Sequence, residues 1–388
     1  MLTGIMIATT DIGPKPVIDR PEVIDIDDKN RQQLFIAFGM RHCLIKAILK
    51  QGMVRKTRQR IMSRQIAQPV GRCIGRRVVV QGNVDAIGMG CGRLHCQIAD
   101  NMNAFGTADN PLAPEFIITA GDRSEAREFR GYQTIWGDIR DEAAVNAAVV
   151  EVDGVIHLAG IIPPHSEADP DLAFAVNVGG SENLLKAIER RGTGKRLVFA
   201  SSIAVHGVRP IDAEPLRADA AYAPMDHYSK HKVECEERIK SSNLAWTILR
   251  IAVCPPIKAA KGFGDLAASF ELPAEEKIEI CHPADVGLAM SNAVASDSSV
   301  GKALLIGGGE NCRHTSYELM SRYLEAAGVG RLPKAAYAHA RTLPAGWVDT
   351  VESQDLLSYQ RHTLDDLICD LERELGFKRL AARIFAPL

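Results

Sequence analysis

The sequence predicts an α/β protein: a Rossmann-like, doubly wound parallel sheet with a smaller carboxyl-terminal lobe. Short apolar runs alternate with helical segments, as at residues 115–119, 154–158 and 195–200. Nearly continuous apolar runs are typical of strands that are buried on both faces of a parallel sheet. The segments between them are long enough for the crossover helices of β-α-β units. These observations favour one sheet with helices on both faces.

Local patterns predict the elements in order along the chain. Strands are expected at 77–82, 115–119, 134–136, 154–158, 195–200, 246–250 and 303–306. Helices are expected at 124–129, 142–150 and 172–190, and in a segment that carries Tyr228 and Lys232. Thr315 begins a further helix, because a glutamate follows three residues later in the spacing of a capping box. Another helix begins at Thr363, and these last two helices end at Gly328 and Gly376.

Three segments follow from changes in composition. Residues 1–75 form a basic extension, residues 76–250 hold the sheet, and residues 251–388 form the smaller lobe. The second boundary lies where a stretch rich in proline and glycine interrupts the alternation of strands and helices. We therefore expect the sheet to be complete before residue 251.

Composition limits the class of protein. The chain has 388 residues, of which 46% are hydrophobic and 24% charged, as in ordinary globular proteins. Nine scattered cysteines argue against a secreted disulfide framework, and no apolar run approaches the roughly 20 residues that span a bilayer. We expect a cytoplasmic protein. Cys91, His95 and Cys96 lack a second pair of ligands, so no metal site is expected.

A basic stretch precedes the expected sheet. No acidic residue lies between Asp28 and Asp85, whereas arginines and lysines crowd residues 55–77. Such a stretch could bind nucleic acid or an anionic membrane. No aromatic residues interleave the basic ones, so we expect a poorly ordered extension and favour neither partner. An alternative is that residues 1–110 do not belong to the ancestral domain, since the sequence changes character near Leu112.

One pair of side chains carries the clearest chemistry. Tyr228 and Lys232 are four residues apart, so on a helix they lie on the same face and can reach one bound molecule. A tyrosine hydroxyl has a pKa of about 10, which a nearby ammonium would lower by stabilising the phenolate. Ser202 follows an apolar run, so its hydroxyl is expected at the carboxyl end of a strand, where ligands bind in open α/β sheets.

Four other residues of this region are expected to take no part in the chemistry or only to contact the substrate. Ser201 is expected to be structural, and Cys254 is expected to be a small apolar filler. His165 and His206 are expected in loops at the carboxyl end of the sheet. Each of these histidines either touches the substrate or lies at the surface, and we favour the surface.

Motifs in a consistent order resemble those of the extended short-chain dehydrogenases/reductases, the NAD-dependent epimerase/dehydratase family. The matching segments are 137–141 (GDIRD), 157–160 (HLAG), 176–185 (VNVGGSENLL), 201–207 (SSIAVHG), 228–232 (YSKHK) and 282–286 (HPADV). Each motif alone is weak evidence, and the resemblance rests on their shared order across residues 116–375. One departure is His206, which stands where the family has tyrosine.

The resemblance implies hydride transfer between a substrate carbon bearing a hydroxyl and a bound nicotinamide. Tyr228 would exchange the hydroxyl proton, Lys232 would hold the phenolate charge and the nicotinamide ribose, and Ser202 would orient the substrate oxygen. Asn177 would support the proton relay. The other residues implied to bind cofactor are Asp138 and Ile139 near the adenine, and Leu158, Ala159 and Gly160 along the cofactor. Residues 76–250 would then be the NAD(P)-binding domain and 251–388 the substrate-binding lobe.

The glycine-rich turn departs from the family pattern. Small residues there normally let the backbone approach the pyrophosphate at a helix amino terminus. Gly82 ends the first expected strand, but Gly88 and the glycines after it lack the GxxGxxG spacing. Two interpretations stay open: a phosphate cradle formed by Gly88, Gly90 and Gly92 after Gly82, or a loop without phosphate contact.

Two adjacent residues leave the choice of cofactor open. Asp122 would favour a free ribose 2′-hydroxyl and hence NAD, whereas Arg123 would accommodate the 2′-phosphate of NADP. We favour NAD and keep NADP as the alternative.

The function implied by the resemblance is that of an NAD(P)-dependent oxidoreductase or epimerase/dehydratase with a small-molecule substrate. The substrate would be a sugar, a nucleotide sugar or a related alcohol, and a homodimer is compatible with the family. A different class is a catalytically silent protein of the same fold that senses NAD(P) or regulates a partner. The glycine-rich region favours this alternative, and the intact set of Ser202, Tyr228 and Lys232 disfavours it.

Overall fold

A seven-stranded parallel sheet forms the centre of the computed structural model, which describes residues 78–83, 115–119, 134–150, 152–192, 194–255, 257 and 270–376. The strand order is β3 (Thr134–Trp136), β2 (Glu115–Thr119), β1 (Val78–Asn83), β4 (Gly154–His157), β5 (Arg196–Ser202), β6 (Ala245–Ile251) and β8 (Lys302–Ile306). Every neighbouring pair is parallel. The order reverses between β1 and β4, the switch point at which ligands bind in doubly wound sheets. The predicted fold class is confirmed.

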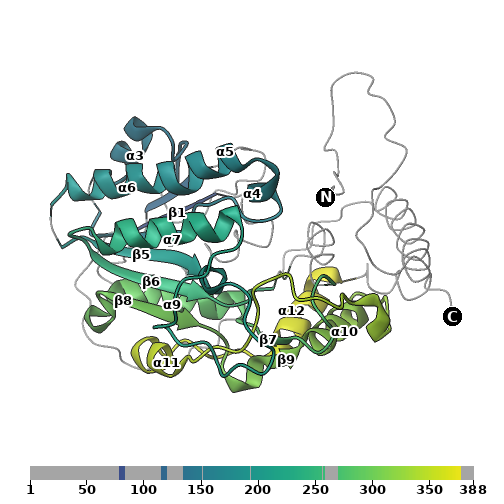
Figure 1. Cartoon of the computed structure of the whole chain (residues 1–388). Helices are drawn as coiled ribbons and strands as arrows, with labels where there is room; N and C mark the ends of the chain where they lie inside the picture. The colour runs from purple at the N-terminus through teal and green to yellow at the C-terminus, as the bar shows by residue number, and fades with distance from the viewer. Residues whose placement is uncertain are drawn as a thin grey trace.

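Helices cover both faces of this sheet (Figure 1). On one face lie α3 (Glu142–Ala148), α6 (Gly180–Glu189) and α7 (His227–Lys240). On the other lie α9 (Pro283–Ala295) and α11 (Val351–Leu357). Successive strand residues point to opposite faces, so Val155 joins the core under α6 whereas Ile156 joins the core under α9. This double burial explains why the strands are apolar without alternation.

The expected boundary at residue 250 does not mark the end of the sheet. Strand β8 pairs with β6 over its whole length, and Leu304, Leu305 and Ile306 are buried. Helix α9 packs on β4, β5 and β6. The chain therefore leaves the sheet after β6, builds part of the lobe and returns, because the apolar edge of β6 and one whole face of the sheet need these later segments as cover.

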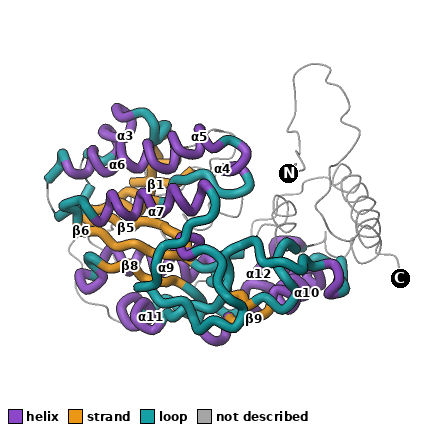
Figure 2. The backbone as a smooth tube through the Cα atoms, in the orientation of Figure 1, coloured by secondary structure: helices purple, strands orange, loops and turns teal. Residues whose placement is uncertain are grey.

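The remaining elements form the smaller lobe, beside the sheet in Figure 2, where loops make up much of the connecting chain. It contains the antiparallel pair β7 (Lys277–Glu279) and β9 (Arg313–Thr315), with α10 (Ser316–Ala326) and α12 (Leu364–Leu375) packed on a separate core. The capping box predicted at Thr315 is confirmed, and Gly328 and Gly376 follow the two helices with positive φ angles.

The helix predicted over 172–190 is three segments. They are α5 (Pro170–Phe174), a π-helical segment (Ala175–Gly179) and α6. The sequence pattern could not show the wide turn, because its residues have ordinary helical spacing. A π turn inside a helix often accompanies a functional site. Asn177 lies at the centre of this segment.

Several expectations concern residues outside the described part of the chain. They are the basic extension 1–75, the helix at 124–129, the cysteines and histidine at 91–96, and the residues Gly88, Asp122 and Arg123. Within the described residues, no helix combines the length and apolar character needed to cross a bilayer.

Candidate active site

Helix α7 is fixed at its amino terminus, where the expected acid/base pair begins. Asp226 accepts a hydrogen bond from the Ser229 amide at 2.7 Å, and the Ser229 hydroxyl accepts one from the Asp226 amide at 3.2 Å. Glu167, from α4 (His165–Ala168), accepts from the amides of His227 and Tyr228, each at 3.2 Å. Carboxylates at this position satisfy amides that have no partner within the helix. Tyr228 therefore lies in a capped and ordered first turn.

Lys232 lies one turn further along the helix and is buried, with 5% of its surface exposed. Its ammonium donates a 2.6 Å hydrogen bond to the carbonyl of Ala200 and lies 4.6 Å from the centre of the Phe199 ring and 5.7 Å from that of Tyr228. Burial lowers the pKa of Lys232 to about 8. An ammonium has three donors, so its bond to Ala200 leaves capacity for the hydroxyls of a bound ligand.

The Tyr228 hydroxyl lies beside Ser202, whose own hydroxyl accepts from the amide of Ala204 at 3.1 Å. Burial raises the pKa of Tyr228 to about 12; the Ser202 hydroxyl opposes this rise and the charge of Asp226 reinforces it. The expected lowering of this pKa by Lys232 is therefore wrong for the protein without ligand, because burial outweighs any effect of the ammonium.

Asn177 is buried close to Lys232 and bonds to the backbone of the turn after β4. Its side-chain oxygen accepts from the amide of Ile161 at 2.6 Å, and its side-chain nitrogen donates to the carbonyl of Ile161 at 2.9 Å. The nitrogen also lies 3.4 Å from Nδ1 of His231. Asn177 thus clamps the backbone just after β4, and its contribution to a proton relay stays a prediction.

The turn after β4 brings the backbone to the same place. Leu158 and Ala159 are buried in the cores on opposite faces of the sheet, so their side chains hold the turn in position. At Gly160, an added Cβ would lie 3.4 Å from the Asn177 oxygen and 3.7 Å from the Lys232 nitrogen. These are ordinary contact distances, so the backbone of Gly160 lies next to both side chains.

The residues expected near the adenine make contacts that do not involve Tyr228, Lys232 or Ser202. Asp138 is exposed and forms an ion pair with Arg140 at 2.5 Å, which lowers the pKa of the aspartate. Ile139 is buried against α6, where a Cβ on Gly180 would overlap its side chain. Gly82 lies near the carboxyl end of β1, the edge of the sheet that also presents Gly160 and Ser202.

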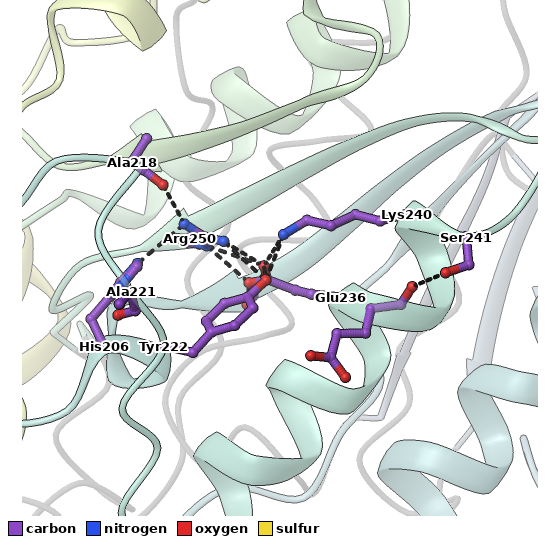
Figure 3. A network of polar contacts seen from close by, with 10 residues as sticks. His206, Ala218, Ala221, Tyr222, Glu236, Lys240, Ser241 and Arg250 are labelled. Atoms are coloured by element: carbon purple, nitrogen blue, oxygen red, sulfur yellow. Dashed lines mark hydrogen bonds and ion pairs between the residues drawn. The ribbon is translucent and has the colours of Figure 1, made fainter.

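The structure contains a buried ionic network beside this site that the sequence did not lead us to expect. Glu236 is fully buried on α7 and accepts from Arg250 of β6, at 3.0 Å from Nε and 2.7 Å from Nη2. It also accepts from the hydroxyl of Ser201 at 2.6 Å and from that of Tyr222 at 2.6 Å. Figure 3 shows Glu236 between Tyr222 and Arg250. The spacing could have indicated Glu236, since it lies one turn after Lys232 on the same helix.

The same network corrects the expectation for one histidine. His206 is buried, not at the surface: its Nδ1 lies 3.0 Å from the carbonyl of Ala221 and its Nε2 3.1 Å from Nη1 of Arg250. It ends the 3₁₀ turn Ile203–His206, and its two partners come from the loop before α7 and from β6. His165 is exposed, as favoured, and Cys254 is half-buried against the core under α9.

The doubly wound sheet, with Tyr228, Lys232 and Ser202 at its carboxyl edge, is the arrangement that the resemblance to the short-chain dehydrogenases/reductases implies. The sequence of residues 112–254 matches the family model described as "NAD dependent epimerase/dehydratase family". The match covers 143 of the 388 residues.

Two similar proteins are D-erythronate dehydrogenases. The one from Cupriavidus necator is 27% identical over 197 residues, which are 50% of this chain and 58% of the relative. The one from Haemophilus influenzae is 33% identical over 86 residues, 22% of this chain and 27% of the relative. The chain thus spans between about a quarter and three fifths of the length of these relatives.

A solved structure shows the same fold. The UDP-glucose 4-epimerase of Thermus thermophilus, in complex with NAD, superposes with a TM-score of 0.60 at 22% identity. The similarity covers 77% of this chain and 99% of the epimerase. At this level of identity, the likeness speaks for the fold alone.

Proposed function

We propose that this protein is an NAD-dependent oxidoreductase or epimerase that acts on a hydroxyl or carbonyl carbon of a sugar acid, nucleotide sugar or related alcohol. One observation carries the proposal. A phenol, an alcohol and a buried ammonium from two separate elements meet at the carboxyl edge of a doubly wound sheet. A purely structural role would not require a lysine to be buried with spare donors beside a half-buried tyrosine.

The described residues fit the nicotinamide end of such a cofactor. Lys232 can donate to ribose hydroxyls, and the backbone of Gly160 lies next to it. When bound, the nicotinamide would supply the acceptor or donor of a hydride. NAD is proposed over NADP because solved relatives, such as the Thermus thermophilus epimerase, contain NAD.

The proposed proton transfer follows from the pKa values. A phenol with a pKa of about 12 is protonated at neutral pH, so Tyr228 can give a proton to the oxygen of a carbonyl substrate that Ser202 orients. In the opposite direction Tyr228 must act as a phenolate. The ammonium of Lys232 provides the positive charge that favours this form once a ligand excludes water.

The sugar acid D-erythronate is the first substrate to test, because two relatives carry that name. A lobe made of β7, β9, α10 and α12 would cover the substrate, a smaller unit than residues 251–388. The five described cysteines are free, which supports the proposed cytoplasmic location. A homodimer is proposed from the family alone.

Titration of the full chain with NADH and NADPH, followed by fluorescence, tests the cofactor. Formation of NADH from NAD and D-erythronate is then followed by absorbance, and conversion of UDP-glucose to its epimer, which regenerates NAD and leaves no net NADH, is followed by NMR. Tight binding of NADH with turnover supports the proposal. Binding without turnover of any alcohol in such a panel would favour the catalytically silent alternative, and absence of binding would contradict both.

A further inference from the structure

We propose that Glu236 is a positioning residue: it locks the helix that carries Tyr228 and Lys232 to the strand that carries Ser202, and it faces Lys232 with a fixed negative charge. The inference deepens the proposed function and rests on it.

The carboxylate joins three elements at one point. Glu236 lies on α7, its partner Ser201 lies on β5 directly before Ser202, and its partner Arg250 lies on β6. In the register of the sheet, Ser201 and Arg250 are direct neighbours. One buried group therefore fixes the distance and the rotation of the helix relative to both strands.

Both oxygens of Glu236 are occupied. One accepts from Ser201 and from Nε of Arg250, and the other accepts from Tyr222 and from Nη2 of Arg250, with Lys240 at 3.4 Å. A carboxylate held from two sides by directional donors has one orientation. Because a shift of about 1 Å in a catalytic group can reduce turnover about 100-fold, this restraint bears directly on rate.

The network also reaches the segment that leads into α7. Arg250 donates to the carbonyl of Ala218 at 2.7 Å, and His206 contacts both Arg250 and the carbonyl of Ala221, as Figure 3 shows. Residues 218–222 are thereby anchored a few positions before Tyr228. The ion pair of Glu236 and Arg250 consequently restrains α7 in two ways: through the Glu236 side chain and through residues 218–222, which precede the helix.

The charge of Glu236 acts on Lys232 as well. Glu236 and Cys235, both on α7, raise the pKa of Lys232 against the burial that lowers it. From β4, His157 faces the lysine, and burial together with the lysine charge lowers the pKa of this histidine to about 3, so it stays neutral. Among these groups, Glu236 is the one that keeps a full negative charge at neutral pH, because its bonds to Arg250 hold its pKa low.

The test compares two isosteric changes on the same helix. Glu236→Gln removes the buried charge, and Glu234→Gln makes the same change in an exposed pair with Arg238 at 2.7 Å. We expect Glu234→Gln to match wild type. We expect Glu236→Gln to lower kcat about 10- to 100-fold, with the Kd for NADH changed less than about threefold. As the pH is raised, Glu236→Gln should also lose activity at a lower pH than wild type does, because Lys232 would lose its proton at a lower pH.

A readout without turnover separates this inference from the proposed function. The titration of Lys232 is followed by NMR of ¹³C-labelled lysine in the protein without ligand, with Lys232→Met used for assignment. The pKa of Lys232 should fall in Glu236→Gln and stay unchanged in Glu234→Gln. Failure of wild type to bind NADH would contradict the proposed function, whereas an unshifted Lys232 titration would contradict the inference.

Ser201→Ala keeps the test decisive if Glu236→Gln does not fold. This change removes the link between β5 and α7 but leaves the ion pair with Arg250 intact. We expect a lower kcat with an unchanged Kd for NADH. Two results together would overturn the proposal. Ser201→Ala would be as active as Glu234→Gln, and the pKa of Lys232 would be unshifted in any folded Glu236 variant.

Discussion

Lys232 is buried, and burial disfavours its charged form. The side chain is 5% exposed, and burial lowers its pKa to about 8, whereas a lysine in an unfolded chain has a pKa of about 10.4. A buried group with spare donors is retained at a cost in stability when it serves a ligand. The sequence could predict that Tyr228 and Lys232 share a helix face, but not the burial that sets both pKa values.

This cost gives a pH dependence with a definite sign. Between pH 8 and 10.4 the unfolded chain binds the lysine proton and the folded protein does not, so the free energy of unfolding rises with pH over this window. Relative to Lys232→Met, wild type should gain about 3 kcal/mol between pH 7 and 10.5. Urea unfolding of both proteins at the two pH values measures this gain. An equal change in both proteins would show that Lys232 is not buried as described.

At the scale of elements, helix α7 and strand β5 place the site. The sequence predicted both of them, together with the position of Ser202 at a strand end. It did not predict the π-helical segment that carries Asn177, because that turn has no signature in residue spacing. It also missed Glu236, whose role depends on Arg250 from a strand that is distant in sequence.

The cap of α7 should matter for catalysis as well as for stability. Asp226→Ala removes the acceptor for the Ser229 amide and should cost about 1 kcal/mol of unfolding free energy. Because Tyr228 lies in the capped turn, kcat should fall as well. Thr363→Ala removes the equivalent cap of α12 in the lobe and is the matched control for stability. Equal kcat values for the two variants would contradict a link between this cap and the site.

At the scale of the molecule, the sheet and the lobe are interleaved in sequence. The fold class was predictable because each strand is apolar and each connection is helical. The boundary was not, because the return of β8 to the sheet depends on burial against β6 and not on any local pattern. Likewise, α9 was expected only as a motif, yet it covers the core that includes Ile156 and Leu249.

A fragment of residues 76–250 should therefore not fold alone. It lacks β8, α9 and α11, so Ile156, Val198 and Leu249 would lie exposed on one face of the sheet. We expect no cooperative unfolding transition in urea when circular dichroism is followed. A sharp transition comparable with that of the full chain would show that the later segments are dispensable for the sheet.

The central claim is that Tyr228 transfers the substrate proton while Lys232 and Ser202 hold their places around it. The most direct measurement is the turnover of NAD and the accepted alcohol by Tyr228→Phe, beside its Kd for NADH. The account predicts a kcat lower by about 100- to 10,000-fold with a Kd within about threefold of wild type. Turnover equal to that of wild type would contradict it.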